Sequence, residues 1–139
     1  MIAFDADVLT EILAGNPQAV SRAATIPPHE QVVPIIVIEE IMRGRLNSIR
    51  QAEAKGSKLS IPRAYELFGQ TLQAFREVTS IPFTTAAESL FQEWRTRNVK
   101  GGIHDLRFAA TCIMHSATLV TRNRRDFETL PGLSLEVWE

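Results

Sequence analysis

Cysteine and long apolar runs are both scarce in this sequence, and each scarcity excludes a class of protein. The single cysteine, Cys112, rules out an intramolecular disulfide, so we expect a reducing compartment. No run approaches the roughly 18 apolar residues of a membrane-spanning helix. The amino terminus lacks the basic region of a signal peptide and meets an acid, Asp5, by its fifth residue. We therefore expect a soluble, cytoplasmic protein with no membrane contact.

The chain also has no excess of either charge, because its 15 Lys and Arg nearly balance its 16 Asp and Glu, which gives a net charge of −1. No strong basic field therefore marks the chain as a nucleic-acid binder. Twelve of the 15 basic residues are nevertheless arginine, whose planar guanidinium suits phosphate. Only four of the acids are aspartate: Asp5, Asp7, Asp105 and Asp126.

The length and composition are those of one globular domain. The chain has 139 residues, of which 45% are hydrophobic and 22% charged, and these values exclude a disordered chain, a coiled coil and a fibre. No linker, repeat or low-complexity tract interrupts it. We expect residues 1–139 to form a single domain.

Apolar runs predict strands that alternate with helices. The predicted strands lie over residues 1–4, 117–121 and 133–138, with another in residues 31–38 that ends near Pro34. Helical spacing predicts helices over residues 8–13, 17–25, 39–54, 60–78, 104–116 and 124–128, and one that begins at Thr84 or Thr85. The buried face of the helix over 60–78 is predicted to comprise Tyr65, Leu67, Phe68, Leu72 and Phe75. This alternation predicts an α/β fold with a parallel sheet.

Acidic residues are placed where such a sheet would bring them together. Asp5 follows the first strand, Asn123 and Asp126 follow the strand over 117–121, and Asp105 and Glu40 lie on helices. Sites in open parallel sheets gather beyond the carboxyl ends of the strands. Clustered carboxylates repel one another unless a cation neutralises them, and ligands that are all oxygen indicate Mg²⁺ or Mn²⁺.

Each acid also has an ordinary structural explanation. Asp7 could be the N-cap of the helix over 8–13, and Asp105 in a first helical turn is favoured by the helix dipole. Glu40 could lie on a solvated helix face, and Asp126 could be a surface charge. We expect His104 to be structural or solvated, and Cys112 to be an inert core residue.

Five segments, in order along the chain, resemble the motifs of PIN-domain ribonucleases, and in particular of VapC-type toxins; the last is the ending Leu130-Pro131-Gly132-Leu133, followed by Trp138. The start, Phe4-Asp5-Ala6-Asp7-Val8-Leu9, is similar to that family's strand, Asp-Thr-Asn and Val/Ile-Leu opening. Glu40-Ile41-Met42-Arg43-Gly44 resembles its Glu-Leu-x-x-Gly element, and Asp105-Leu106-Arg107-Phe108-Ala109-Ala110 its central Asp-Leu-x-Ile-Ala-Ala helix. Leu119-Val120-Thr121-Arg122-Asn123, followed by Asp126-Phe127, is similar to its Leu-Val-Thr-Arg-Asn-x-x-Asp-Phe segment.

The resemblance implies a PIN-like three-layer α/β/α fold, with a short, mainly parallel central sheet flanked by helices. It implies an endoribonuclease that holds Mg²⁺ or Mn²⁺ through Asp5, Glu40 and Asp105, the toxin of a toxin–antitoxin pair. Asp7 stands where the family often has Asn, and the family's fourth acidic position falls on Asn123, with Asp126 as a substitute. RNA, a small antitoxin protein and a second copy of the chain are the implied partners. Candidate contacts to RNA phosphates are Arg43, Arg122, Arg124 and Arg125.

Two other functions remain open at this point. Phe4-Asp5-Ala6-Asp7 after a strand would also suit the aspartyl nucleophile of a haloacid-dehalogenase-like phosphatase. The other alternative is a catalytically silent PIN-like domain that only binds RNA or a partner.

Overall fold

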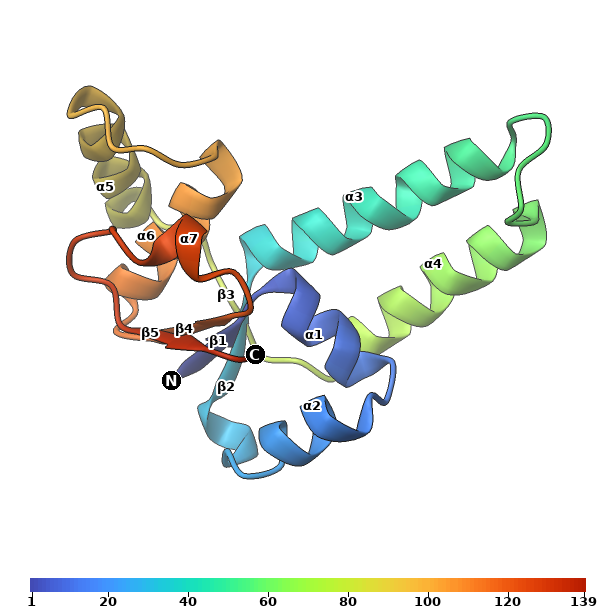
Figure 1. Cartoon of the computed structure of the whole chain (residues 1–139), viewed down its shortest axis with the longest axis horizontal. Helices are drawn as coiled ribbons and strands as arrows, with labels where there is room; N and C mark the ends of the chain where they lie inside the picture. The colour runs from blue at the N-terminus through green and yellow to red at the C-terminus, as the bar shows by residue number, and fades with distance from the viewer.

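The structure, a computed structural model, describes all 139 residues and has a five-stranded parallel sheet at its centre (Figure 1). The strands are β1 (Ile2–Phe4), β2 (Gln31–Pro34), β3 (Ser80–Ile81), β4 (Thr118–Thr121) and β5 (Leu135–Val137), in the order β3-β2-β1-β4-β5. The helices are α1 (Ala6–Leu13), α2 (Pro17–Ala23), the short 3₁₀ helix η1 (Pro28–Glu30), α3 (Ile35–Ala52), α4 (Ile61–Phe75), α5 (Thr85–Thr96), α6 (Ile103–Met114) and α7 (Arg124–Phe127).

The strand order determines which helices cover which face. Connections between parallel strands are right-handed, so the direction of each step along the sheet decides the side of its helices. The steps from β1 to β2 to β3 place α1 and α2 on one face, and the return to β4 and β5 places α5, α6 and α7 on the other (Figure 1). This arrangement is the predicted three-layer α/β/α fold with a short parallel sheet.

The core lies between the sheet and the helix predicted to be central. In α6, Phe108, Ala109, Ala110 and Cys112 are fully buried, in a cluster of 25 buried residues. The rings of Phe108 and Phe127 pack edge to face, 5.8 Å apart. Burial also raises the pKa of the Cys112 thiol above its ordinary range, as expected of an inert core cysteine.

The helix after β2 begins four residues earlier than predicted, at Ile35 rather than Glu39. The strand predicted to end near Pro34 does end there, and the β-branched residues that follow it form the first turn of α3. Pro34 has extended backbone angles and precedes the helix as its N-cap residue. The buried side chains of Ile36 and Val37 then pack into the core from a helix, so tertiary packing overrides their β propensity.

Helices α3 and α4 form a hairpin that extends away from the rest of the protein (Figure 1). Our prediction of a buried face on α4 is wrong for two residues, because Tyr65 is 55% and Leu72 48% exposed. Leu46 of α3 and Ile61 of α4 are exposed as well. Over much of their length α3 and α4 lie only against each other, so some of their apolar side chains face solvent (Figure 1). No helix of the structure is both long enough and apolar enough to cross a membrane.

Candidate active site

Asp5 lies at the carboxyl end of β1, where the strand gives way to α1, and it is the N-cap of that helix. Its Oδ1 accepts a hydrogen bond from the backbone N–H of Ala6 (2.7 Å), and its Oδ2 accepts one from the hydroxyl of Thr121 (2.7 Å). Burial raises the pKa of Asp5 above its ordinary value, although these two hydrogen bonds oppose the shift. The carboxylate is therefore held in one orientation while its charge is poorly solvated.

Glu40 lies on the second turn of α3 and faces His104 of α6. The Nδ1 atom of His104 is 3.6 Å from the Glu40 carboxylate, and its Nε2 atom is 2.8 Å from the carbonyl oxygen of Ile36. Burial raises the pKa of Glu40, His104 lowers it, and the charges of Asp5 and Asp7 raise it again. His104 therefore has a structural role, because its ring joins α6 to the start of α3 and lies beside the Glu40 carboxylate.

Asp105 is in the first turn of α6 and has the largest pKa shift of the acids at this edge. Burial raises the pKa of Asp105 to about 6, and the charges of Asp126, Asp5 and Glu40 add to that shift. The charges of three acids that are distant in sequence, Asp126, Asp5 and Glu40, therefore all act on Asp105.

Asp7 is not the N-cap of α1, because the helix begins two residues earlier than predicted and Asp5 caps it. Asp7 is instead an exposed residue of the first turn, where its charge raises the pKa of both Asp5 and Glu40. This position leaves the supporting role as the remaining prediction for Asp7.

Asn123 and Asp126 are joined to each other. The Asn123 side-chain amide donates a hydrogen bond to Asp126 Oδ2 at 2.6 Å, so the amide holds the acid near the edge of the sheet. Of the charged groups that raise the pKa of Asp105, Asp126 has the largest effect. The pair places a carboxylate next to Asp105 even though the position after Thr121-Arg122 is an amide.

The donor chemistry of this edge suits a hard divalent cation. Asp5, Glu40 and Asp105 offer only carboxylate oxygens, and burial raises the pKa of each, so a cation would relieve an unfavourable charge. No group of three or more His, Cys, Asp or Glu side chains already has the spacing needed to hold a metal ion. The three acids therefore interact electrostatically in this structure without forming a metal-binding arrangement.

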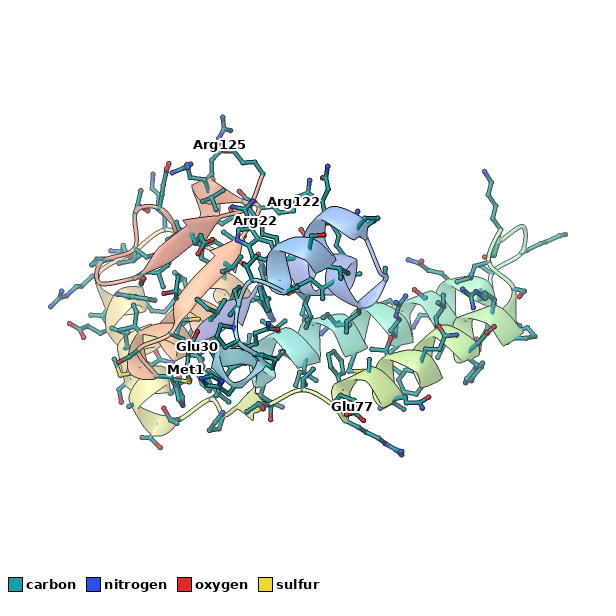
Figure 2. The ribbon with its side chains drawn as sticks, turned by 90° about the horizontal axis from the view of Figure 1, so that it is seen from below. Met1, Arg22, Glu30, Glu77, Arg122 and Arg125 are labelled. Carbon is teal, nitrogen blue, oxygen red and sulfur yellow. The ribbon has the colours of Figure 1, made fainter.

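Two of the four predicted phosphate-binding arginines form ion pairs within the protein, and the other two do not. Arg43 is paired with Glu39 on the same helix, and Arg122 is paired with Glu11 of α1. Arg124 and Arg125 of α7 are exposed and form no ion pair, and Arg125 points away from the body of the protein (Figure 2).

Sequence reasoning missed Thr121 as a site residue. Its side chain is fully buried at the last position of β4, and its hydroxyl accepts from the Asn123 N–H (3.0 Å) while donating to Asp5. A hydroxyl residue ending an otherwise apolar strand at the sheet's carboxyl edge is the signal that could have identified it.

The comparison with protein families agrees with this geometry. The model of the PIN domain matches residues 2–133, nearly the whole chain. The chain belongs to the PIN domain family. PIN domains are generally nucleases, and the match does not favour the phosphatase alternative.

Solved structures from several bacteria share the fold of this PIN domain. A toxin–antitoxin complex from Klebsiella pneumoniae has a TM-score of 0.70 at 22% identity, covering 96% of this chain and 95% of that chain. VapBC2 from Rickettsia felis, bound to a DNA fragment from the promoter, has a TM-score of 0.74 at 22% identity and covers 100% of both chains. FitAcB from Neisseria gonorrhoeae has a TM-score of 0.74 at 19% identity, covering 97% of this chain and 96% of that chain. No curated protein sequence matches the chain.

Proposed function

We propose that residues 1–139 form a single nuclease domain, an Mg²⁺- or Mn²⁺-dependent endoribonuclease that is the toxin of a toxin–antitoxin pair. The observation that supports it most directly is the shared electrostatic environment of Asp5, Glu40 and Asp105 at the carboxyl edge of the sheet. The preference for RNA follows from the resemblance to VapC-type toxins, and the motifs that carry it include all three acids.

In this proposal each acid has a separate task. Asp5 and Asp105 would bind the cation directly, and the Thr121 hydroxyl would keep the Asp5 carboxylate in its binding orientation. Glu40 would bind the cation or accept a proton from the attacking water, because its raised pKa favours proton uptake. Asp7, Asn123 and Asp126 would support this set. A bound divalent cation supplies an activated water and neutralises charge on the phosphodiester.

Arginine side chains would hold the RNA strand near these acids. Arg124 and Arg125 form no ion pair and are available to phosphate oxygens, whereas Arg43 and Arg122 would exchange a carboxylate for a phosphate. Exposed ion pairs contribute only about 0–1 kcal/mol, so this exchange costs little.

Two protein partners complete the proposal. A toxin must be kept inactive, and a small antitoxin protein that inserts an arginine or a strand into the acidic cleft would do so. The exposed apolar residues of the α3–α4 hairpin, Leu46, Ile61, Tyr65 and Leu72, form the kind of surface that binds a protein. The resemblance also motivates a homodimer.

The direct test is metal-dependent RNA cleavage by the purified chain. We expect cleavage with Mg²⁺ or Mn²⁺, none in excess chelator, and recovery when Mn²⁺ is added, because the ligands are hard oxygens. Cleavage that persists unchanged in excess chelator would remove the metal-dependent mechanism. RNA binding without cleavage in either metal would support the silent-domain alternative.

A further inference from the structure

A cavity of about 200 Å³ lies between α1, α2 and the end of β4, on the side of α1 away from Glu40. Its polar lining comprises two cations, Arg22 and Arg122, two carboxylates, Glu11 and Glu139, and two amides, Asn16 and Gln18. Figure 2 shows Arg22 and Arg122 close together beside the first two helices. None of the predicted functional sites uses Arg22, Asn16 or Gln18.

Arg22 is held in place without an ion pair, although Glu11 and Glu139 also line the cavity, and a bound anion would compete with them. Its guanidinium carbon lies 4.8 Å from the centre of the Trp138 ring, so the cation stacks on an aromatic face. Trp138 is itself 95% buried and is fixed by hydrogen bonds from its backbone N–H to the Thr121 carbonyl (2.8 Å) and from its indole N–H to Glu136 (2.9 Å). Arg22 forms no ion pair with any carboxylate. Its planar set of donors is therefore ordered by the tryptophan and free to bind an anion.

The second arginine is available at small cost. Arg122 pairs with Glu11 on the surface, where the two side chains are 49% and 36% exposed. Such a pair is weak, and a phosphate that accepts two parallel hydrogen bonds from the guanidinium competes with it. Asn16 uses its side-chain oxygen to accept from the Ala19 N–H (3.1 Å), which leaves its amino group able to donate.

Two residues that line the cavity, Arg122 and Trp138, are bonded to Thr121, which in turn positions Asp5. Arg122 is the residue after Thr121, whose hydroxyl binds Asp5, and the carbonyl of Thr121 binds the backbone of Trp138. One short segment therefore places both a site acid and the two arginines.

We propose that the Arg22–Arg122 cavity binds a backbone phosphate of single-stranded RNA, at a position separate from the three acids. This inference rests on the proposed function and adds a substrate subsite to it. Glu11 acts as a competitor within the subsite, because it occupies Arg122 when no phosphate is bound. Free nucleotide could supply the same phosphate chemistry, and the test separates the two sources.

The test measures binding of fluorescently labelled single-stranded RNA to the full chain in chelator, with gels to show that the RNA stays intact. Arg22→Gln should weaken binding about tenfold, as expected for loss of a charge-assisted hydrogen bond. The slope of log affinity against log salt should fall by about 0.7, the value for one phosphate contact on a single strand. Arg50→Gln, at the far end of α3, is the matched control and should change neither quantity. Glu11→Gln should strengthen binding, because it frees Arg122.

Unchanged affinity and unchanged salt slope in Arg22→Gln, with melting temperature preserved, would overturn the subsite. If that variant still cuts RNA with wild-type KM and kcat, only the subsite fails and the nuclease function stands. If the wild-type chain binds no RNA, both fail together. A mononucleotide that binds in an Arg22-dependent way, without any Arg22 effect on RNA, would reassign the cavity to free nucleotide and overturn the proposal for RNA.

Discussion

The hydroxyl of Thr121 donates a hydrogen bond to Asp5 Oδ2 across 116 positions of sequence, because Thr121 ends β4 and Asp5 directly follows the neighbouring strand β1. Because β1 and β4 are parallel and in register, with Phe4 opposite Val120, their carboxyl ends meet at one edge. The position of the acid is therefore a consequence of strand pairing, and the buried hydroxyl sets its orientation.

Replacing Thr121 with Val should impair the site while keeping the shape of the side chain. The variant removes the donor to Asp5 and the acceptor of the Asn123 N–H. Loss of such a supporting contact lowers metal affinity or activity by about 10–100-fold, and an unsatisfied buried group costs about 1–3 kcal/mol of stability. Thr121→Ser, which keeps the hydroxyl, is the control. Mn²⁺ titration and RNA cleavage measure the effect, and equal activity in both variants would contradict the role.

Asp105→Asn separates a metal ligand from an ordinary helix-start acid. If Asp105 only favours the helix dipole, the change costs about 0.3–1 kcal/mol and leaves cleavage intact. If it shares a site with Asp5 and Glu40, removing its charge relieves repulsion, so the metal-free variant melts at the same or a higher temperature. Wild type should gain about 2.7 kcal/mol when Mg²⁺ is at a hundred times its dissociation constant, and the variant little. Paired thermal melts with and without Mg²⁺, beside a cleavage assay, give the answer, and wild-type cleavage with the same Mg²⁺ shift would contradict the assignment.

The sequence was sufficient to predict where the acids lie in the fold, but not which residues contact the surrounding side chains. Asp5 ends an apolar strand, and the alternation of strands and helices predicted a parallel sheet, so the location of the site could be inferred. The contact between His104 and Ile36 spans 68 positions, and it depends on how α6 packs against α3. No local pattern predicts such a contact.

Two errors have the same physical origin. The β-branched residues after Pro34 favour a strand locally, but packing of Ile36 and Val37 against the core selects a helix. The apolar spacing of Tyr65 and Leu72 defines one face of α4 correctly, yet it cannot say whether anything covers that face. Burial depends on the rest of the fold or on another chain.

The raised pKa of Asp105 predicts the pH dependence of the metal-free protein. Its pKa in the folded state, about 6, is above the ordinary carboxyl value of 3.8, so the folded state retains the proton longer than the unfolded state. Stability from this group is therefore fully present below about pH 4 and is lost as the pH rises towards about 6. The cation needs the ionised carboxylate, so the Mn²⁺-induced increase in melting temperature should be small near pH 5 and large near pH 7.5. Thermal melts at several pH values test this, and a Mn²⁺ shift that is independent of pH would contradict it.

The exposed stripe on the hairpin predicts a partner contact that is separate from cleavage. Changing Tyr65 to Arg adds a charge at a position that is 55% exposed, so folding and RNA cleavage should be preserved. Binding of the antitoxin should weaken, because a charge in the centre of an apolar interface must be desolvated. Co-expression with the proposed small antitoxin, followed by co-purification, measures the binding. Lys58→Glu in the turn of the hairpin is the control, and equal co-purification by both variants would place the antitoxin elsewhere.

Asp126→Asn should distinguish a working fourth acid from a surface charge, because the two explanations predict opposite signs. Asp126 has the largest effect among the charges that raise the pKa of Asp105. If it is only a surface charge, its removal lowers that pKa, and metal binding near pH 6 becomes tighter. If Asp126 helps to hold the cation, directly or through a water, metal affinity falls by about 10–100-fold in spite of the easier ionisation of Asp105.

Asn123→Ala removes the amide that holds Asp126 and should then lower the metal affinity as well. The effect in the double variant should be less than additive. Glu128→Gln, on the same exposed segment, is the control for loss of one negative charge. Mn²⁺ titrations near pH 6 decide the sign, and tighter binding in Asp126→Asn would leave Asp5, Glu40 and Asp105 as the complete acidic set.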